Sequence, residues 1–218
     1  SGIVPLGSLG EAATLTFDEK VAIVRSLREV LDDSVPIVAG IGSLTTRESV
    51  ALAQAVADVG ADGLMVLPPY VHRGDWREIR THFSEVFAAT SLSCMLYNNP
   101  IAYSTDVSAA QMAELAHKHE NLHSVKESGG DVRRVSAIRE ELGDRLRILV
   151  GIDDMIVESI AVGASGWIAG LVNALPEESV RLFDLAMAGE REQALELYDW
   201  FLPLLRLDPT PDFVQLIK

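Results

Sequence analysis

The sequence contains one cysteine and only four lysines among its 218 residues, and both shortages restrict what the protein can be. The single cysteine, Cys94, excludes an internal disulfide and a cysteine-rich metal site, so we expect a reducing, cytoplasmic environment. No stretch approaches the roughly 18 uninterrupted apolar residues of a membrane helix. The first residues also lack the basic and apolar regions of a signal peptide, and we therefore expect no membrane partner.

Positive charge is also in short supply. The chain has 18 Lys plus Arg against 32 Asp plus Glu, a formal net charge of -14. Such a field repels nucleic acid and anionic membrane surfaces, so neither is an expected partner. It does not oppose a small anionic substrate, which backbone N–H groups and one or two cations can bind locally. With 48% hydrophobic and 23% charged residues, the chain is globular rather than disordered.

Short apolar runs of strand length recur along the whole chain, with longer amphipathic segments between them. We expect strands at Ile3–Leu6, Pro36–Ala39, Gly63–Leu67, Cys94–Tyr97, His123–Lys126, Ile148–Gly151 and Gly166–Ile168. Strands that alternate with helices and are almost wholly apolar are typical of a parallel sheet with helical crossovers.

The segments between the strands have helical periodicity and recognisable start signals. The clearest helices are expected at Arg47–Val59, Ala109–Lys118 and Pro176–Met187, and Pro176 stands where a first helical turn tolerates proline. Four pairs have capping-box spacing: Thr16 with Glu19, Thr45 with Glu48, Asp75 with Glu78 and Ser108 with Gln111.

Seven strand–helix units favour a closed α/β barrel, the TIM (β/α)8 fold, over an open doubly wound sheet. That barrel has eight units and typically about 250 residues. The chain starts inside a strand, so we expect that its first βα unit is missing, whether absent from the molecule or only from this chain. Residues 1–176 would then form strands 2 to 8 of the barrel. Residues 177–218 would form the last barrel helix and the start of a C-terminal helical region.

Lys126 is the one lysine expected at the end of a strand, where the catalytic groups of barrels collect. Period-two alternation puts Lys126, Ser124 and Leu122 on one face of that strand. If this face is the barrel interior, the desolvated amine favours its neutral, nucleophilic form, which forms Schiff bases with carbonyl substrates. The alternative is a lysine that extends out of the barrel mouth or pairs with Glu127.

Tyr97 and Ser8 are also expected at strand ends. The phenol of Tyr97 could transfer protons to and from a carbinolamine, or it could be an aromatic group at the barrel mouth with a satisfied hydroxyl. The Gly7-Ser8-Leu9-Gly10 loop offers a hydroxyl and backbone N–H groups to a carboxylate, although a tight turn explains its glycines equally well. Gly40-x-Gly42 lacks the other residues of a phosphate or dinucleotide motif.

Metal-binding patterns are weak. His117 and His119 are two apart on a helix and point to different sides. Asp153 and Asp154 could bind a hard cation, but capping of the following helix is the simpler interpretation. The sequence also lacks an obvious Ser-His-Asp arrangement, and we expect no metal.

Four motifs in order resemble the dihydrodipicolinate synthase and N-acetylneuraminate lyase family. They are Gly7-Ser8-Leu9-Gly10-Glu11, Tyr97-Asn98-x-Pro100, Val125-Lys126-Glu127-Ser128 and Gly151-x-Asp153-Asp154. Each motif is weak alone, but the four together cover essentially the whole chain at family-like spacing. The resemblance implies an eight-stranded βα barrel, a homotetramer, and an enzyme that acts on a small carboxylate.

The resemblance also implies a role for each matched position. Lys126 is then the Schiff-base lysine, so no separate cofactor is needed, Tyr97 is the proton-transferring phenol, and Ser8 relays protons. The implied substrate-binding residues are Gly7, Leu9, Ser128, Gly151, Asp153 and Ile168.

Several departures bear on the substrate. Val71 follows Tyr70 where the synthases have a second tyrosine that reaches into the neighbouring subunit. Ala102 replaces the arginine that holds the second substrate's carboxylate in the synthases, and Leu9 replaces a hydroxyl residue. Gly151-x-Asp153-Asp154 is nearer the lyase pattern, but Gly170 replaces a lyase serine.

The segments 97–103 and 166–173 are most similar to the hydroxyproline-degradation branch, whose enzymes deaminate 1-pyrroline-4-hydroxy-2-carboxylate. The alternatives are dihydrodipicolinate synthesis, and aldol cleavage of 4-hydroxy-2-oxoglutarate or a 2-keto-3-deoxy sugar acid. A non-catalytic barrel that binds 2-oxo acids, and a metal-dependent lyase that uses Asp153 and Asp154, also remain open.

Overall fold

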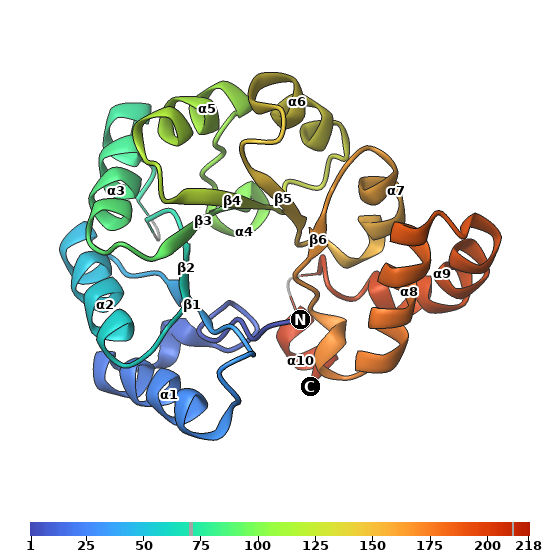
Figure 1. The fold of residues 1–218 in the computed structure, drawn as a ribbon, viewed down its shortest axis with the longest axis horizontal. Helices are drawn as coiled ribbons and strands as arrows, with labels where there is room; N and C mark the ends of the chain where they lie inside the picture. Colours follow the sequence, from blue (N-terminus) through green and yellow to red (C-terminus); the bar gives the residue numbers. More distant parts are fainter. Residues whose placement is uncertain (70–71, 211) are drawn as a thin grey trace.

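The computed structural model describes residues 1–69, 72–210 and 212–218. Within them, six parallel strands form one sheet in which each strand pairs with the next in sequence. The strands are β1 (Val38–Ile41), β2 (Gly63–Val66), β3 (Ser93–Asn98), β4 (Leu122–Glu127), β5 (Arg147–Val150) and β6 (Gly166–Trp167). Figure 1 shows the sheet curled round a centre with the main helices outside it. This arrangement confirms the predicted α/β architecture and differs from a doubly wound sheet, which carries helices on both faces.

Helices alternate with the strands. They are α1 (Phe17–Val30), α2 (Thr46–Asp58), α3 (Trp76–Ala88), α4 (Pro100–Tyr103), α5 (Ala109–Lys118), α6 (Arg133–Leu142), α7 (Ile156–Ala161), α8 (Pro176–Ala188), α9 (Arg191–Leu205) and α10 (Phe213–Ile217). Three short 3-10 turns are η1 (Ala12–Thr14), η2 (Asp153–Met155) and η3 (Leu171–Asn173).

The predicted helix starts are confirmed by hydrogen bonds. Complete capping boxes begin α1 at Thr16, α3 at Asp75 and α5 at Ser108. Each box satisfies N–H groups that the first helical turn leaves without partners. Thr45 accepts from the N–H of Glu48, and proline occupies the first turn of α8 as expected.

The first expected strand is reduced to a single bridge, in which Ile3 pairs with Ile37. The Pro5 carbonyl still accepts from the N–H of Gly40, but Pro5 has no N–H to donate and Leu6 has a left-handed φ of 64°, so no regular strand forms. The segment still packs closely on β1, because a Cβ on Gly40 would lie 2.3 Å from the Leu6 carbonyl oxygen. The close approach of the two backbones therefore explains why residue 40 is a glycine, and no bound phosphate is needed.

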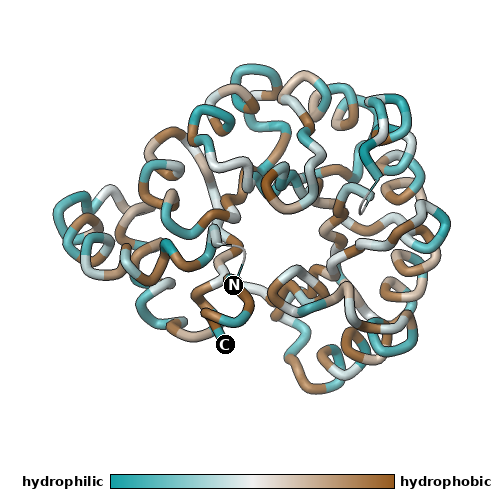
Figure 2. The backbone as a smooth tube through the Cα atoms, turned by 180° about the vertical axis from the view of Figure 1, so that it is seen from behind, coloured by the Kyte–Doolittle hydropathy of each residue, from teal (hydrophilic) through white to brown (hydrophobic). Residues whose placement is uncertain are grey.

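Two groups of buried side chains cover the two faces of the sheet. The larger group packs between the strands and the helices and includes Phe83, Phe87 and Leu96. The smaller group lies on the inner face and consists of Met65, Leu67, Met95 and Tyr97, with Leu149 and Ile168 packed against it. Figure 2 shows hydrophobic residues concentrated along the strands and hydrophilic ones on the outer turns of the helices.

The predicted alternation along β4 is wrong at Leu122. Cys94 pairs with Leu122, but the next residue, Met95, pairs with Ser124, so β4 carries one extra residue at a bulge. Because the bulge breaks the period of two, Leu122 packs in the outer core with Cys94, whereas Lys126 remains on the inner side.

The segment after α9 returns to the centre of the molecule. Lys218 forms an ion pair with Glu11, which places α10 beside the N-terminal loop, as Figure 1 also shows. Ile217 and Asp208 pack against Gly170, where a Cβ would collide with both side chains. The segment therefore occupies the space between β6 and the N-terminal residues. The proposed boundary between 1–176 and 177–218 stays a prediction.

Candidate active site

Lys126 and Tyr97 lie side by side at the ends of β4 and β3. They are directly paired in the parallel register, and the Lys126 Nζ lies 4.3 Å from the centroid of the Tyr97 ring. Tyr97 is buried and Lys126 half-buried. The electron-rich face of a phenol ring attracts an ammonium at this distance. The sheet thus brings together two residues that the sequence separates by a complete βα unit.

Asn99 orients the Tyr97 phenol. Its amide nitrogen donates to the Tyr97 hydroxyl over 3.0 Å, while its amide oxygen accepts from the N–H of Ala102 and caps α4. The Tyr97 ring also meets the ring of Tyr103 edge to face, with centroids 5.7 Å apart. The short turn of α4 therefore holds two phenols against each other.

Ser8 reaches the same place from the N-terminal loop. Its hydroxyl is hydrogen-bonded to the hydroxyl of Tyr103, so it joins the two tyrosines through Tyr103. Gly7 faces open space, since a Cβ there would touch only Met65 of the inner cluster, at 3.9 Å. Leu9 packs against the outer hydrophobic core.

Gly151 and Ser128 surround the stem of the lysine. A Cβ on Gly151 would lie 2.2 Å from both the Lys126 Cε and the Ser128 Oγ, so a side chain at Gly151 would occupy the space of both. Ser128 is fully buried, and its hydroxyl has no hydrogen-bond partner among the described residues. Ile168, another predicted substrate-binding residue, packs against the inner cluster.

Glu127 points away from Lys126, because successive residues of a strand face opposite sides. Its buried carboxylate accepts from Asn98 and the N–H of Gly129 and forms an ion pair with Arg134 at 3.1 Å. Burial raises the pKa of Glu127, and Arg134 opposes that shift. The alternative of a Lys126–Glu127 pair is therefore wrong.

Asp153 is completely buried and fully engaged. Its carboxylate accepts from the Trp167 indole at 3.0 Å and from the N–H groups of Gly170 and Leu171. These last two groups begin η3, whereas α7 begins without a side-chain cap. The expectation that Asp153 caps the helix following it is therefore wrong: the loop after β5 turns the carboxylate toward β6 instead. Burial raises the pKa of Asp153.

Asp208 is a site residue that the sequence did not reveal. Its carboxylate accepts from the N–H of Asp153 at 3.3 Å. Burial, and then the charge of Asp153, raise the pKa of Asp208 to about 7, while the nearby charge of Lys126 lowers it. The Asp208-Pro209-Thr210-Pro211 run, of which Pro211 lies outside the described residues, is typical of a turn and gives no sign of a site residue. Asp208 comes close to Asp153 and Lys126 only through contacts with loops that are far away in sequence.

The structure thus brings together Lys126, Tyr97, Ser8, Ser128 and Gly151. The Tyr70-Val71 pair lies outside the described residues. Within the described part of the chain, no three His, Cys, Asp or Glu side chains are grouped as metal ligands.

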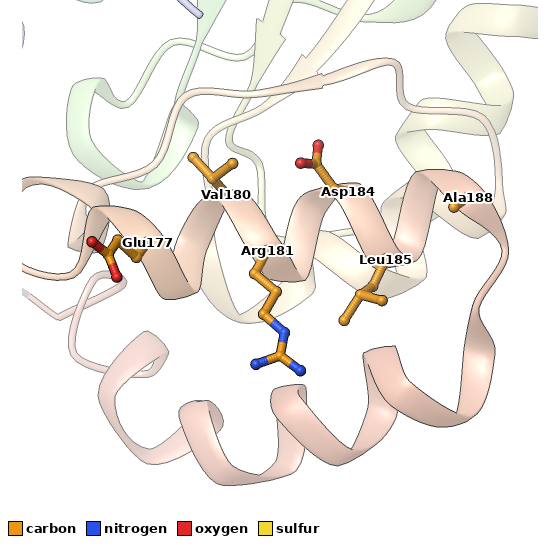
Figure 3. Close-up of a pocket in the computed structure, with 6 residues that line it drawn as sticks. All are labelled: Glu177, Val180, Arg181, Asp184, Leu185 and Ala188. Carbon is orange, nitrogen blue, oxygen red and sulfur yellow. The ribbon is translucent and has the colours of Figure 1, made fainter.

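A hollow of about 650 Å³ lies elsewhere, along the outer helix α8. Figure 3 shows its lining residues, with Arg181 and Leu185 directed toward the neighbouring helix. The lining holds none of the residues to which the sequence pointed. We therefore place the candidate site at the strand ends and not here.

Comparison with known proteins agrees with the motif pattern. The model of the dihydrodipicolinate synthetase family matches residues 1–218. The chain belongs to this family. The 4-hydroxy-tetrahydrodipicolinate synthase of Methanoculleus marisnigri is 36% identical over 206 residues, which cover 94% of this chain and 70% of that protein.

Solved structures of the dihydrodipicolinate synthetase family have the same fold. Dihydrodipicolinate synthase from Aquifex aeolicus superposes with a TM-score of 0.91 at 30% identity, over 95% of this chain and 71% of its own. YagE, a family member from E. coli K12 in complex with pyruvate, gives 0.92 at 27% identity, over 99% of this chain and 74% of its own. The TIM-barrel fold class and the class I lyase and aldolase family are thereby confirmed. The absence of a first βα unit stays a prediction.

None of the helices in the described residues combines the length and the hydropathy needed to cross a bilayer.

Proposed function

We propose that this chain forms a Schiff base between Lys126 and a small 2-oxo acid or cyclic imino acid. The observation that carries the proposal is the pairing of Lys126 with Tyr97, with 4.3 Å between the Nζ and the ring centroid. A primary amine is a nucleophile toward carbonyl carbon, and the neighbouring phenol can exchange protons with the carbinolamine that forms. The covalent bond uses the lysine itself, so we propose no separate cofactor.

The other predicted residues have roles that fit their positions. Ser8 would exchange protons with the reacting group, and the backbone around Gly7 would bind the substrate carboxylate. The hydroxyl of Ser128, which has no partner in the described part of the chain, lies beside the lysine stem, where it can bond to the carbinolamine. Asp153 is saturated by donors, so its proposed part is to hold the pocket wall rather than to exchange ligands.

For the substrate we propose 1-pyrroline-4-hydroxy-2-carboxylate. Ala102 provides no cation for the carboxylate of a second substrate. The Asp153 and Asp208 carboxyl groups near the lysine also provide no positive charge for such a carboxylate.

The reaction balances without an oxidant or reductant. The lysine amine adds to C2 and the ring nitrogen departs from C2 but stays on C5. Loss of the 4-hydroxyl as water then follows through the enamine and leaves a C3–C4 double bond. Proton shifts from C5 and its amine to C3 and C4 then convert the C5 amine into an imine. Water hydrolyses C5 to release ammonia and C2 to release the lysine, so the product is 2-oxoglutarate semialdehyde.

The second candidate is dihydrodipicolinate synthesis, in which pyruvate forms the Schiff base and attacks an aldehyde. The names of the relatives favour it, since the Methanoculleus marisnigri protein is a 4-hydroxy-tetrahydrodipicolinate synthase. Aldol cleavage of 4-hydroxy-2-oxoglutarate or a 2-keto-3-deoxy sugar acid uses the same first step. The expected homotetramer and cytoplasmic location stay predictions.

Borohydride trapping tests the covalent step. The protein is incubated with pyruvate, or with 1-pyrroline-4-hydroxy-2-carboxylate, then reduced, digested and analysed by peptide mass spectrometry. We expect the added mass on Lys126, none in Lys126→Ala, and an undiminished adduct in Lys118→Ala, which removes an exposed lysine of α5. An adduct on another lysine, or turnover by Lys126→Ala, would refute the proposal.

Steady-state turnover separates the branches. We expect ammonia release from 1-pyrroline-4-hydroxy-2-carboxylate to exceed condensation of pyruvate with aspartate semialdehyde. Faster condensation would assign the synthase reaction and overturn the interpretation of Ala102. Binding of 2-oxo acids without adduct or turnover would indicate the non-catalytic barrel.

A further inference from the structure

Tyr103 occupies a position that none of the motif comparisons assigns. Its hydroxyl is hydrogen-bonded to the hydroxyl of Ser8, and its ring packs edge to face on Tyr97 at 80°. The ring of Tyr97 in turn faces the Lys126 ammonium. The N-terminal loop, the segment from β3 to α4 and the strand β4 therefore meet at this pair of phenols.

The backbone holds Tyr103 in place from both sides. Its N–H donates to the Asn99 carbonyl over 3.0 Å, and Asn99 also fixes the Tyr97 hydroxyl. The next residue, Ser104, ends α4 with a left-handed φ of 57°, and its hydroxyl accepts from Arg73 over 3.1 Å. A non-glycine residue in this conformation is uncommon, so the turn that presents Tyr103 is specified by its surroundings.

Exposure differs between the two phenols. Tyr97 is 4% exposed, whereas Tyr103 is only half-buried. The proton that the departing hydroxide takes up near Lys126 must come from water, and the buried phenol of Tyr97 offers no direct way in. Ser8 and Tyr103 form a hydrogen-bonded pair of hydroxyls, and both residues are half-buried, so the pair meets solvent where Tyr97 does not.

We propose that Tyr103 is a positioning residue that acts through Ser8, orienting its hydroxyl and exchanging the proton that Ser8 donates during Schiff-base formation. In this step the carbinolamine C–O bond breaks and Ser8 gives its proton to the departing hydroxide, which forms water. Ser8 takes the Tyr103 proton, and water on the exposed side restores it. The inference rests on the proposed Schiff-base function and adds a residue to it.

Kinetics of Tyr103→Phe test the proposal, because this variant keeps the ring contact with Tyr97 and removes only the hydroxyl. We expect kcat to fall about 100-fold, with KM changed less than about twofold and the alkaline limb of the kcat–pH profile shifted. The Lys126 adduct still forms, but more slowly. A double variant with Ser8→Ala should be no slower than Ser8→Ala alone, since the two groups act as one unit.

Tyr198→Phe is the matched control. It also removes a phenol hydroxyl, one that donates to the Asp154 carbonyl beside α9, and we expect its kcat–pH profile to be unchanged. Wild-type kinetics in Tyr103→Phe, or losses that multiply in the double variant, would overturn the proposal.

Tyrosine ionisation in the resting protein supplies a readout that does not require turnover. Ultraviolet titration follows the pH at which each tyrosine ionises. We expect Ser8→Ala to shift this pH for one tyrosine only. The same tyrosine should be absent from the titration of Tyr103→Phe. No change on Ser8→Ala would refute the coupling. Absence of the Lys126 adduct in the wild type, with the titration shift intact, would instead refute the proposed function.

Discussion

The side chains of Lys126 and Tyr97 face each other across neighbouring strands, with the Nζ 4.3 Å from the ring centroid. The contact is made by the ring face, while the hydroxyl is held separately by Asn99. The ring of Tyr97 contacts the lysine, whereas its hydroxyl is the group that can exchange protons. A substitution can therefore remove one function and keep the other.

Tyr97→Phe should keep the ring face and lose the proton-transferring hydroxyl. We expect the borohydride-reduced adduct to appear on Lys126 at equilibrium, while kcat falls about 10²- to 10⁴-fold. Stopped-flow reaction with pyruvate, quenched by borohydride, measures the rate. An unchanged kcat would mean that the phenol takes no part in proton transfer.

Gly151→Ala should displace the lysine. The new methyl group would lie 2.2 Å from both the Lys126 Cε and the Ser128 Oγ, so the lysine stem must move, and overpacking costs about 1–3 kcal/mol. We expect the adduct to be largely lost and the melting temperature to fall. Gly189→Asn is the control, because nothing lies within 4 Å of a Cβ there and asparagine tolerates the left-handed φ of 76° that ends α8. Equal adduct yield in both variants would contradict this account of Gly151.

Arg134→Met should leave the buried carboxylate of Glu127 without its cation, at a cost of about 3–5 kcal/mol in the free energy of unfolding. Burial already raises the pKa of Glu127. The folded protein therefore binds more protons than the unfolded chain between the ordinary glutamate pKa of 4.5 and the raised pKa of Glu127. The free energy of unfolding decreases as the pH rises through this interval. The loss should therefore be smaller in acid, and Glu127→Gln should reverse part of it.

Urea unfolding of Arg133→Met provides the comparison for Arg134→Met. Arg133 pairs with Asp131 while 87% exposed, and an exposed pair contributes about 0–1 kcal/mol. Similar losses in the two variants would show that burial of the Glu127–Arg134 pair is unimportant.

Asp208→Asn should change how stability depends on pH. Because the pKa of Asp208 is raised to about 7, the folded protein keeps this proton after the unfolded chain has lost it. The free energy of unfolding of the wild type should fall from about pH 4 to about pH 7, then level off. Urea titrations across this range should give a shallower slope for Asp208→Asn, whereas Asp212→Asn, at an exposed residue of the same segment, should match the wild type.

Local signals predicted much of this fold. The helix at Ala109–Lys118 was predicted at both ends, because Ser108 and Gln111 form a capping box that fixes its start. The position of Lys126 at a strand end followed from apolar run length and was confirmed. Such features depend on neighbouring residues, which a sequence displays directly.

Tertiary contacts account for what the sequence did not predict. The bulge opposite Cys94 moved Leu122 to the other face because strand register depends on both partners. Asp208 reaches Asp153 across 55 residues, and no local pattern marks that contact. Tyr103 lies in the segment 97–103 that resembles the hydroxyproline-degradation branch, but nothing local predicts its bond to Ser8, which spans 95 residues.

The contacts of the C-terminal segment also determine where the molecule opens most readily. Backbone ladders join β1 through β6, whereas Lys218 meets Glu11 through side chains separated by 207 residues. Side-chain contacts that close so long a loop break at a lower free energy than a central ladder. Amide hydrogen exchange should therefore be fastest at this joint and slowest in β3 and β4. The two strands that carry Tyr97 and Lys126 would then keep their register while the contacts between the C-terminal segment and the N-terminal loop open and close.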